Sequence, residues 1–203
     1  PIYLVLLLVA GVSFVVFFFW YYGSPKYTDL GYRPIQPVAY SHKLHAGDLG
    51  MDCRYCHTSV EVSAIASVPP TQTCMNCHEV VGKDSEKLLP VRESWASGKP
   101  IEWIRVHDLP DYSYFDHSVH IHAGVGCESC HGNVANMEVV ELKETLSMGW
   151  CLECHRAPEM HLRRPDEITK MNWKPPSDQL EYAAKVIKEK QIAPPIECSG
   201  CHR

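Results

Sequence analysis

The sequence predicts a mainly α-helical chain with much irregular structure, made of one membrane-spanning helix and a small cysteine-rich domain. The chain of 203 residues opens on a long uncharged run, and its fifteen prolines and twelve glycines favour turns and short elements. Ten cysteines and twelve histidines are too many for an ordinary globular enzyme of this length, so a large α/β catalytic core is excluded. A net charge of -5 makes nucleic acid an unsuitable partner.

The opening run, residues 2–22, predicts a transmembrane helix. It has no charged residue, and Ser13 is its one polar interruption. At 1.5 Å per residue the run spans about 30 Å, the thickness of the hydrocarbon layer of a bilayer. Trp20, Tyr21 and Tyr22 then provide an interfacial aromatic belt. A cleaved signal peptide would have a shorter apolar core and a small-residue cleavage site, so we expect a retained anchor, with residues 23–36 as a linker.

All ten cysteines fall into five copies of Cys-x-x-Cys-His, the attachment signature of c-type haem. Positions i, i+3 and i+4 lie on one face of a helical turn, so both thiols can form thioethers with one porphyrin while the histidine ligates its iron. The sequence therefore predicts five covalently bound haem c groups. The predicted attachment cysteines are Cys53, Cys56, Cys74, Cys77, Cys127, Cys130, Cys151, Cys154, Cys198 and Cys201, and the proximal ligands are His57, His78, His131, His155 and His202.

Two other interpretations of the cysteines are less consistent with the pattern. The intervals between Cys56 and Cys74 and between Cys130 and Cys151 fit a four-cysteine zinc site, but five pairs leave one pair over. Neither a zinc site nor a disulfide framework needs a histidine after every pair. Because haem c is attached outside the cytoplasm, we expect the domain on the periplasmic face of a bacterial inner membrane.

An internal repeat indicates which histidines ligate the distal side of each iron. Residues 40–45 and 115–120 both read aromatic-x-His-x-x-His, and each of these leader segments precedes a pair of cysteine motifs. His at i and i+3 share a helical face and can serve two different haems. The predicted distal ligands are therefore His42, His45, His117 and His120, with His107 as the fifth, Met137 and Met148 as fallbacks, and His122 and His161 as bystanders.

The repeat also gives a domain plan. We expect a first dihaem module over residues 37–90, a connecting segment over 91–112, a second dihaem module over 113–176, and a C-terminal helix with the fifth haem over 177–203. Pro90 and Gly98 should bound a short helix. The helix at 178–190 should begin with a capping box and bury one apolar face. That box pairs Asp178 with Glu181, and the face comprises Leu180, Ala183, Ala184 and Ile187.

The leader segments and the motifs after them resemble the class III multihaem cytochromes c. The combined layout is closer still to the pentahaem, membrane-anchored cytochromes c of alternative complex III. Anchored tetrahaem quinol dehydrogenases have one haem fewer, and the menaquinone reductase cytochromes typically have six. The resemblance implies a class III-like multihaem domain with one transmembrane helix. It also implies partners within a respiratory complex: a quinol-binding membrane subunit, an iron–sulfur subunit and a monohaem cytochrome c.

The function expected from these features is electron transfer without catalysis of its own. Double histidine ligation would keep each iron low-spin and closed to substrates. Electrons would pass from a quinol-oxidising complex to a periplasmic cytochrome c or a terminal oxidase. Two alternatives stay open: a stand-alone membrane-anchored quinol dehydrogenase, and a multihaem reductase that would need one open distal site.

Overall fold

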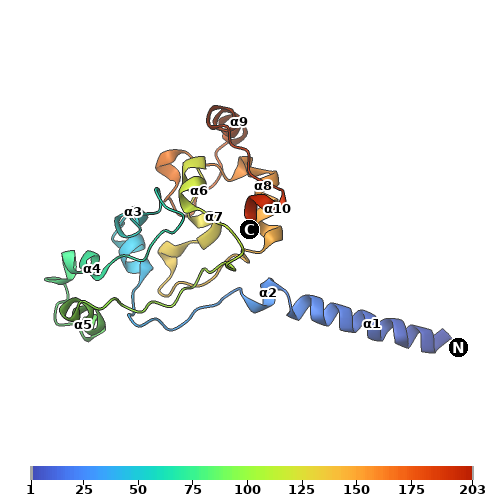
Figure 1. Ribbon diagram of the computed structural model, residues 1–203, viewed down its shortest axis with the longest axis horizontal. Coiled ribbons are helices and arrows are strands. Elements are labelled where there is room, and N and C mark those ends of the chain that lie inside the picture. The colour runs from blue at the N-terminus through green and yellow to red at the C-terminus, as the bar shows by residue number, and fades with distance from the viewer. Residues whose placement is uncertain (1, 203) are drawn as a thin grey trace.

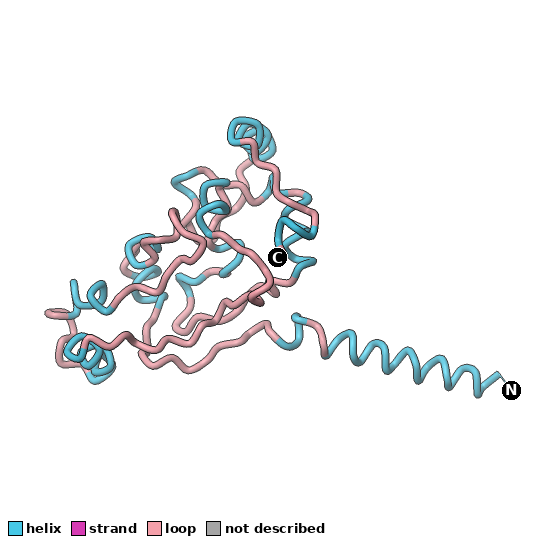
Figure 2. The backbone as a smooth tube through the Cα atoms, in the orientation of Figure 1, coloured by secondary structure: helices cyan, strands magenta, loops and turns pink. Residues whose placement is uncertain are grey.

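The computed structural model describes residues 2–202 as short helices joined by long irregular segments, and it assigns no β-strand in that range (Figures 1 and 2). This confirms the predicted mainly helical class. The α-helices are α1 (Ile2–Tyr22), α2 (Pro25–Thr28), α3 (Cys53–Cys56), α4 (Thr71–His78), α5 (Leu89–Ser97), α6 (His117–Ala123), α7 (Glu128–His131), α8 (Met148–Arg156), α9 (Gln179–Lys190) and α10 (Cys198–Cys201). The π- and 3-10 helices are η1 (Lys43–Asp48), η2 (Glu86–Leu88), η3 (Val134–Asn136), η4 (Pro158–Met160) and η5 (Pro165–Glu167).

Helix α1 has the predicted bounds and extends away from the rest of the molecule (Figure 1). None of its 21 residues is buried, and its length and composition allow it to cross a membrane. Where α1 ends at Tyr22, the ring of Tyr27 packs against it. The centroid of Tyr27 lies 4.6 Å from that of Tyr22 and 5.8 Å from that of Tyr21. These tyrosines form an aromatic cluster where the helix meets the domain, as expected at a membrane–water interface.

The segment after α1 is fixed to the domain by backbone hydrogen bonds. Gly31 N–H donates to the Leu142 carbonyl at 2.8 Å, and Leu142 N–H donates to the Tyr32 carbonyl at 3.0 Å. Leu142 itself is buried and lies a few residues before α8. The base of the anchor is therefore held against the part of the domain that carries α8.

Few apolar side chains of the domain are buried. One small cluster contains Val60, Ile121 and Ile168, and Leu162 is buried separately at 1% exposure. Much of the interior is instead a cavity of about 2080 Å³, roughly twice the upper end of ordinary ligand pockets. Packing of this kind is expected where bound cofactors supply much of the core.

Two peripheral helices test the predictions from local sequence. Helix α5 starts with Pro90 in its first turn and ends at Gly98, whose φ of 69° is the left-handed conformation that glycine adopts freely. The predicted capping box on α9 is wrong. Asp178 is the N-cap residue but makes no capping hydrogen bond, because its carboxylate instead accepts from Arg164 Nη2 at 2.8 Å.

Candidate haem-binding site

Each of the five cysteine motifs forms or borders one helical turn, as the spacing predicted. Helices α3, α4, α8 and α10 contain both cysteines of their motifs, and Cys127 is the N-cap of α7. All ten cysteines are free thiols. Within residues 2–202, no three His, Cys, Asp or Glu side chains are grouped closely enough to hold a metal ion directly.

Three pairs of histidine rings, called the facing pairs below, lie at nearly the same separation. The ring centroids are 6.1 Å apart for His45 and His78, 6.3 Å for His117 and His131, and 6.1 Å for His120 and His155. A metal–imidazole bond of about 2 Å places a metal about 3 Å from the ring centroid, so two imidazoles on opposite sides of one metal are about 6 Å apart. Each pair thus has the spacing of two axial ligands of one iron.

The pairing follows the internal repeat. The second histidine of each leader segment, His45 or His120, faces the second motif of its own module. In the second module the first histidine, His117, faces His131 of the first motif. The repeat therefore matches His42 with His57 in the first module. Burial lowers the pKa of His42 to about 4, and the nearby His57 contributes to that shift.

Backbone carbonyls hold these rings in one tautomer. Six of the eight histidines in these four pairs place Nδ1 2.7–2.8 Å from a carbonyl oxygen. Because a carbonyl only accepts, Nδ1 carries the proton and Nε2 keeps the lone pair that an iron needs. The contacts are His45 to Ser41, His57 to Ser67, His78 to Val81, His117 to Ala64, His120 to Asp116 and His155 to Pro195.

The aromatic residue of each leader segment positions both of its histidines. The ring centroid of Tyr40 lies 4.8 Å from that of His42 and 4.5 Å from that of His45. Phe115 makes the same two contacts in the second module, at 4.7 Å to His117 and 4.5 Å to His120. In each module one histidine ring stands on edge to the aromatic ring and the other is stacked on it. The aromatic position in the repeat is thus explained by packing.

The centre of the domain favours neutral imidazole. Burial, together with smaller contributions from the neighbouring His107 and His117, lowers the pKa of His131 to about 3. Burial likewise lowers the pKa of His120. At neutral pH these rings are uncharged, which is the form that ligates iron.

His107, the predicted fifth distal ligand, lies close to His131. The centroids of the two rings are 4.3 Å apart at an interplanar angle of 74°, too close for an iron between them. The Nε2 atom of His107 is buried and has no hydrogen-bond partner. Its neighbours Val106 and Asp108 line the large cavity, whereas His107 does not.

The large cavity contains the fourth and fifth motifs. Its lining includes Cys151, Cys154, Cys198, Cys201, His155 and His202, together with His120, His122 and His161. The Nδ1 atom of His122 lies 2.7 Å from the Ser118 carbonyl, the same contact that the paired histidines make. Of the fallback ligands, Met137 is buried at 8% exposure, and Met148 is 58% exposed and lines the cavity.

Comparison with known proteins agrees with this geometry. Residues 119–203 match the family model for cytochrome c3. Over 171 residues the chain is 32% identical to the menaquinone reductase, multiheme cytochrome c subunit, of Nitratidesulfovibrio vulgaris (strain Hildenborough), covering 73% of this chain and 78% of that protein. The chain belongs to this family of multihaem cytochromes c. The cofactor of the cytochrome is therefore covalently bound c-type haem, and the facing histidines, free thiols and large cavity all fit that group.

Proposed function

We propose that this cytochrome is the pentahaem electron-transfer subunit of a membrane complex of the alternative complex III type. In this role it passes electrons from quinol oxidation to a periplasmic cytochrome c or a terminal oxidase, and its haem domain lies on the periplasmic side. Its partners are a quinol-binding membrane subunit, an iron–sulfur subunit and a monohaem cytochrome c. The single apolar helix α1 supports attachment to the membrane.

The observation that carries the electron-transfer role is the spacing of the facing histidines. A ring on each side of the iron leaves no coordination position for a substrate, which favours electron transfer over catalysis at the metal. Haem, when bound, supplies one-electron exchange at its iron. The chain supplies two attachment thiols per motif, two axial imidazoles and carbonyls that fix each imidazole.

The haem count and the electron donor are tested together. We expect five haems per chain in the pyridine haemochrome assay, because each motif has its own cysteine pair. In anaerobic membranes that contain the whole complex, a reduced naphthoquinol should reduce these haems within the turnover time of the enzyme. Fewer than five haems contradicts the count, and haems that dithionite reduces but quinol does not contradict the role.

A second candidate function is electron transfer in the opposite direction, from a periplasmic donor through this subunit to a quinone. The relative from Nitratidesulfovibrio vulgaris is a subunit of a menaquinone reductase, in which a quinone is the acceptor. Supplying membranes with a reduced periplasmic cytochrome and an oxidised naphthoquinone distinguishes the two. Quinol formation faster than quinol consumption favours the reductase.

The site assignment follows the facing pairs. We assign His42 with His57, His45 with His78, His117 with His131, and His120 with His155. The fifth haem is held by Cys198 and Cys201, with His202 as its proximal ligand. For its distal side the sequence predicts His107, which stays a prediction. The contacts favour His122, which lines the same cavity as His202 and has Nδ1 bonded to a carbonyl.

Methionine substitution at these two positions decides the fifth ligand. If the replaced histidine is the distal ligand, one haem acquires the near-infrared charge-transfer band of His/Met ligation and a higher reduction potential. We expect this change in His122→Met and an unchanged spectrum in His107→Met. The reverse result identifies His107 as the fifth distal ligand. If the spectrum changes in neither variant, neither histidine is that ligand. Magnetic circular dichroism of the oxidised protein provides the readout.

A further inference from the structure

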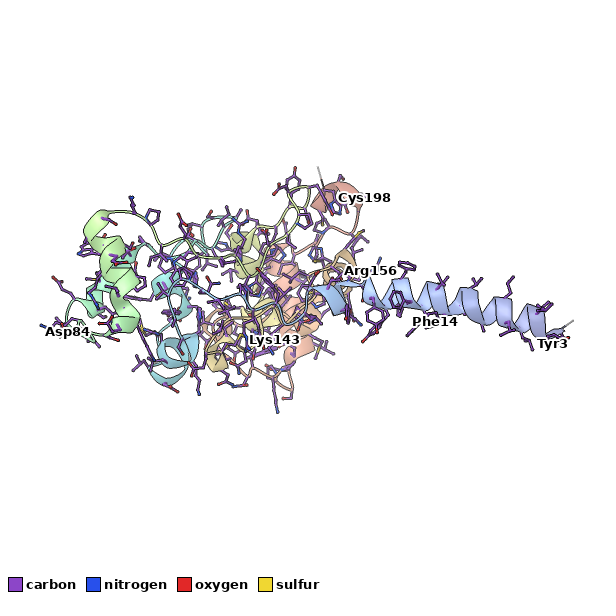
Figure 3. The ribbon with its side chains drawn as sticks, turned by 90° about the horizontal axis from the view of Figure 1, so that it is seen from below. Tyr3, Phe14, Asp84, Lys143, Arg156 and Cys198 are labelled. Carbon is purple, nitrogen blue, oxygen red and sulfur yellow. The ribbon has the colours of Figure 1, made fainter. Side chains whose placement is uncertain are left out.

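The five motifs are arranged along the long axis of the molecule in an order that differs from their order in the sequence. Along this axis α8 and α10 lie at the end of the domain nearest α1, α7 is central, α3 comes next, and α4 lies at the far end (Figure 1). The side-chain view agrees. Arg156, at the end of α8, and Cys198 lie near the anchor, whereas Asp84, a few residues past α4, lies at the opposite end (Figure 3).

Contacts between neighbouring motifs support a single row of motifs, called the cofactor file below. Its order is fifth, fourth, third, first and second. The fifth and fourth are joined where Nδ1 of His155 donates to the carbonyl of Pro195 at 2.7 Å, three residues before Cys198. Cys130 of the third motif lines the same cavity as the fourth.

The third and first motifs are linked although they belong to different modules. Cys127 packs against the buried cluster that contains Val60, which lies just after the first motif. The ring of His117 is held by the carbonyl of Ala64, in the loop after the first motif, at 2.8 Å. The first and second motifs are then joined by Asn76 Nδ2, which donates to the Tyr55 hydroxyl at 3.3 Å.

The end of this file nearest the anchor holds the fourth and fifth motifs, which line one large cavity. The cavity that contains Cys198, Cys201 and His202 is also lined by Pro25, Thr28, Asp29 and Tyr32 at the base of the anchor. The opposite end is open to solvent. Cys77 is exposed, and Val80 and Val81, just past the second motif, are 79% and 61% exposed.

We propose that the fifth motif is the membrane-side port of the cofactor file and the second motif is its outer port, with the other three sites between them in the order fourth, third, first. The two port roles rest on the proposed electron-transfer function, whereas the spatial order of the motifs does not depend on it. The order predicts that removing the haem site at either end leaves the other four sites occupied by haem, because each end site has only one neighbouring motif.

The order is tested by distance in the full-length protein held in lipid nanodiscs. Phospholipid with a nitroxide on its headgroup should accelerate electron-spin relaxation most for the haem at the fifth motif. This strongest effect should disappear in the variant C198A/C201A and persist in the matched variant C74A/C77A. Loss of the effect in C74A/C77A instead, or equal relaxation of all haems, overturns the order.

A kinetic measurement on the whole complex tests the ports. With C198A/C201A we expect at least a tenfold slower reduction of the four remaining haems by naphthoquinol, while dithionite still reduces all four. With C74A/C77A we expect reduction of the four haems at the wild-type rate and at least a tenfold loss of transfer to the soluble acceptor. The opposite pattern overturns the assignment of ports.

Two controls keep these outcomes distinct. If wild-type haems exchange no electrons with quinol or quinone, the proposed function fails, and the nitroxide measurement still decides the order. If C74A/C77A does not accumulate, His45→Ala retains the thioethers of the second motif and changes the spectrum of that haem alone. Its signal can then be identified in the intact file and should show the weakest nitroxide effect.

Discussion

We expect the substitution His117→Ala to convert the haem proposed at the third motif from low-spin to high-spin and to leave the other haems low-spin. His117 faces His131 across 6.3 Å with ring planes 9° apart, and its Nδ1 is fixed by Ala64. Removing the ring opens one axial position, because Phe115, which packs on edge to His117, carries no ligating atom. The reduction potential of this haem should rise by roughly 0.1 V or more, within the ~0.8 V range that axial ligands control.

The measurement is electron paramagnetic resonance of the oxidised protein, followed by a redox titration. Added imidazole should enter the vacated position and restore the low-spin signal, which a merely structural defect would not do. His161→Ala is the matched control, since the side chain of His161 is exposed and makes none of the ring contacts of the ligand pairs. A low-spin spectrum in H117A without imidazole would falsify the pairing of His117 with His131.

We expect the substitution Arg163→Met to lower the free energy of unfolding by about 3 kcal/mol, the range for breaking a buried ion pair. Arg163 is 4% exposed and its guanidinium donates to the Lys170 carbonyl at 2.7 Å. It also contacts the Glu128 carboxylate at 3.4 Å and lies over the ring of Trp173 at 4.6 Å. Methionine keeps most of the volume but leaves the carboxylate and the carbonyl without this donor.

This substitution also affects the third cysteine motif, because Glu128, the partner of Arg163, directly follows Cys127. The Glu128 carboxylate also accepts the backbone N–H groups of Asn172, at 2.8 Å, and Trp173, at 3.2 Å. For a domain of this size, about 3 kcal/mol corresponds to a decrease in Tm of roughly 6–12 °C, measured by circular dichroism on the haem-loaded protein. Arg105→Met is the control: the Arg105–Asp108 pair is exposed and should contribute less than about 1 kcal/mol. Equal losses in both variants would contradict the role of the buried pair.

Local sequence predicted those features that depend on local geometry. The uncharged run of residues 2–22 has the bounds of α1, and Pro90 and Gly98 bound α5 as expected. The motif spacing placed each cysteine pair on a helical turn. In each case one rule of chain geometry, such as a helical period, a fixed proline φ or the freedom of glycine, determines the result without any partner elsewhere in the chain.

Helix α9 shows where local rules fail. Its predicted apolar face included Leu180 and Ala184, but the structure exposes both and buries Gln179, Ala183 and Val186. Gln179 is turned inward because its Nε2 donates to the Glu159 and Leu162 carbonyls at 2.6 and 2.7 Å. A polar residue at the centre of the buried face cannot be recognised from periodicity, because its partners are 17 and 20 residues away.

The amino-acid sequence was enough to predict a membrane-spanning helix, five haem-attachment motifs and two leader segments. Which histidine faces which, where His107 and His122 lie, and the order of the motifs along the molecule came from the three-dimensional fold. The physical reason is that attachment depends on residues three and four positions apart. Axial pairing and spatial order depend on contacts between distant segments, such as His117 with Ala64 and His155 with Pro195.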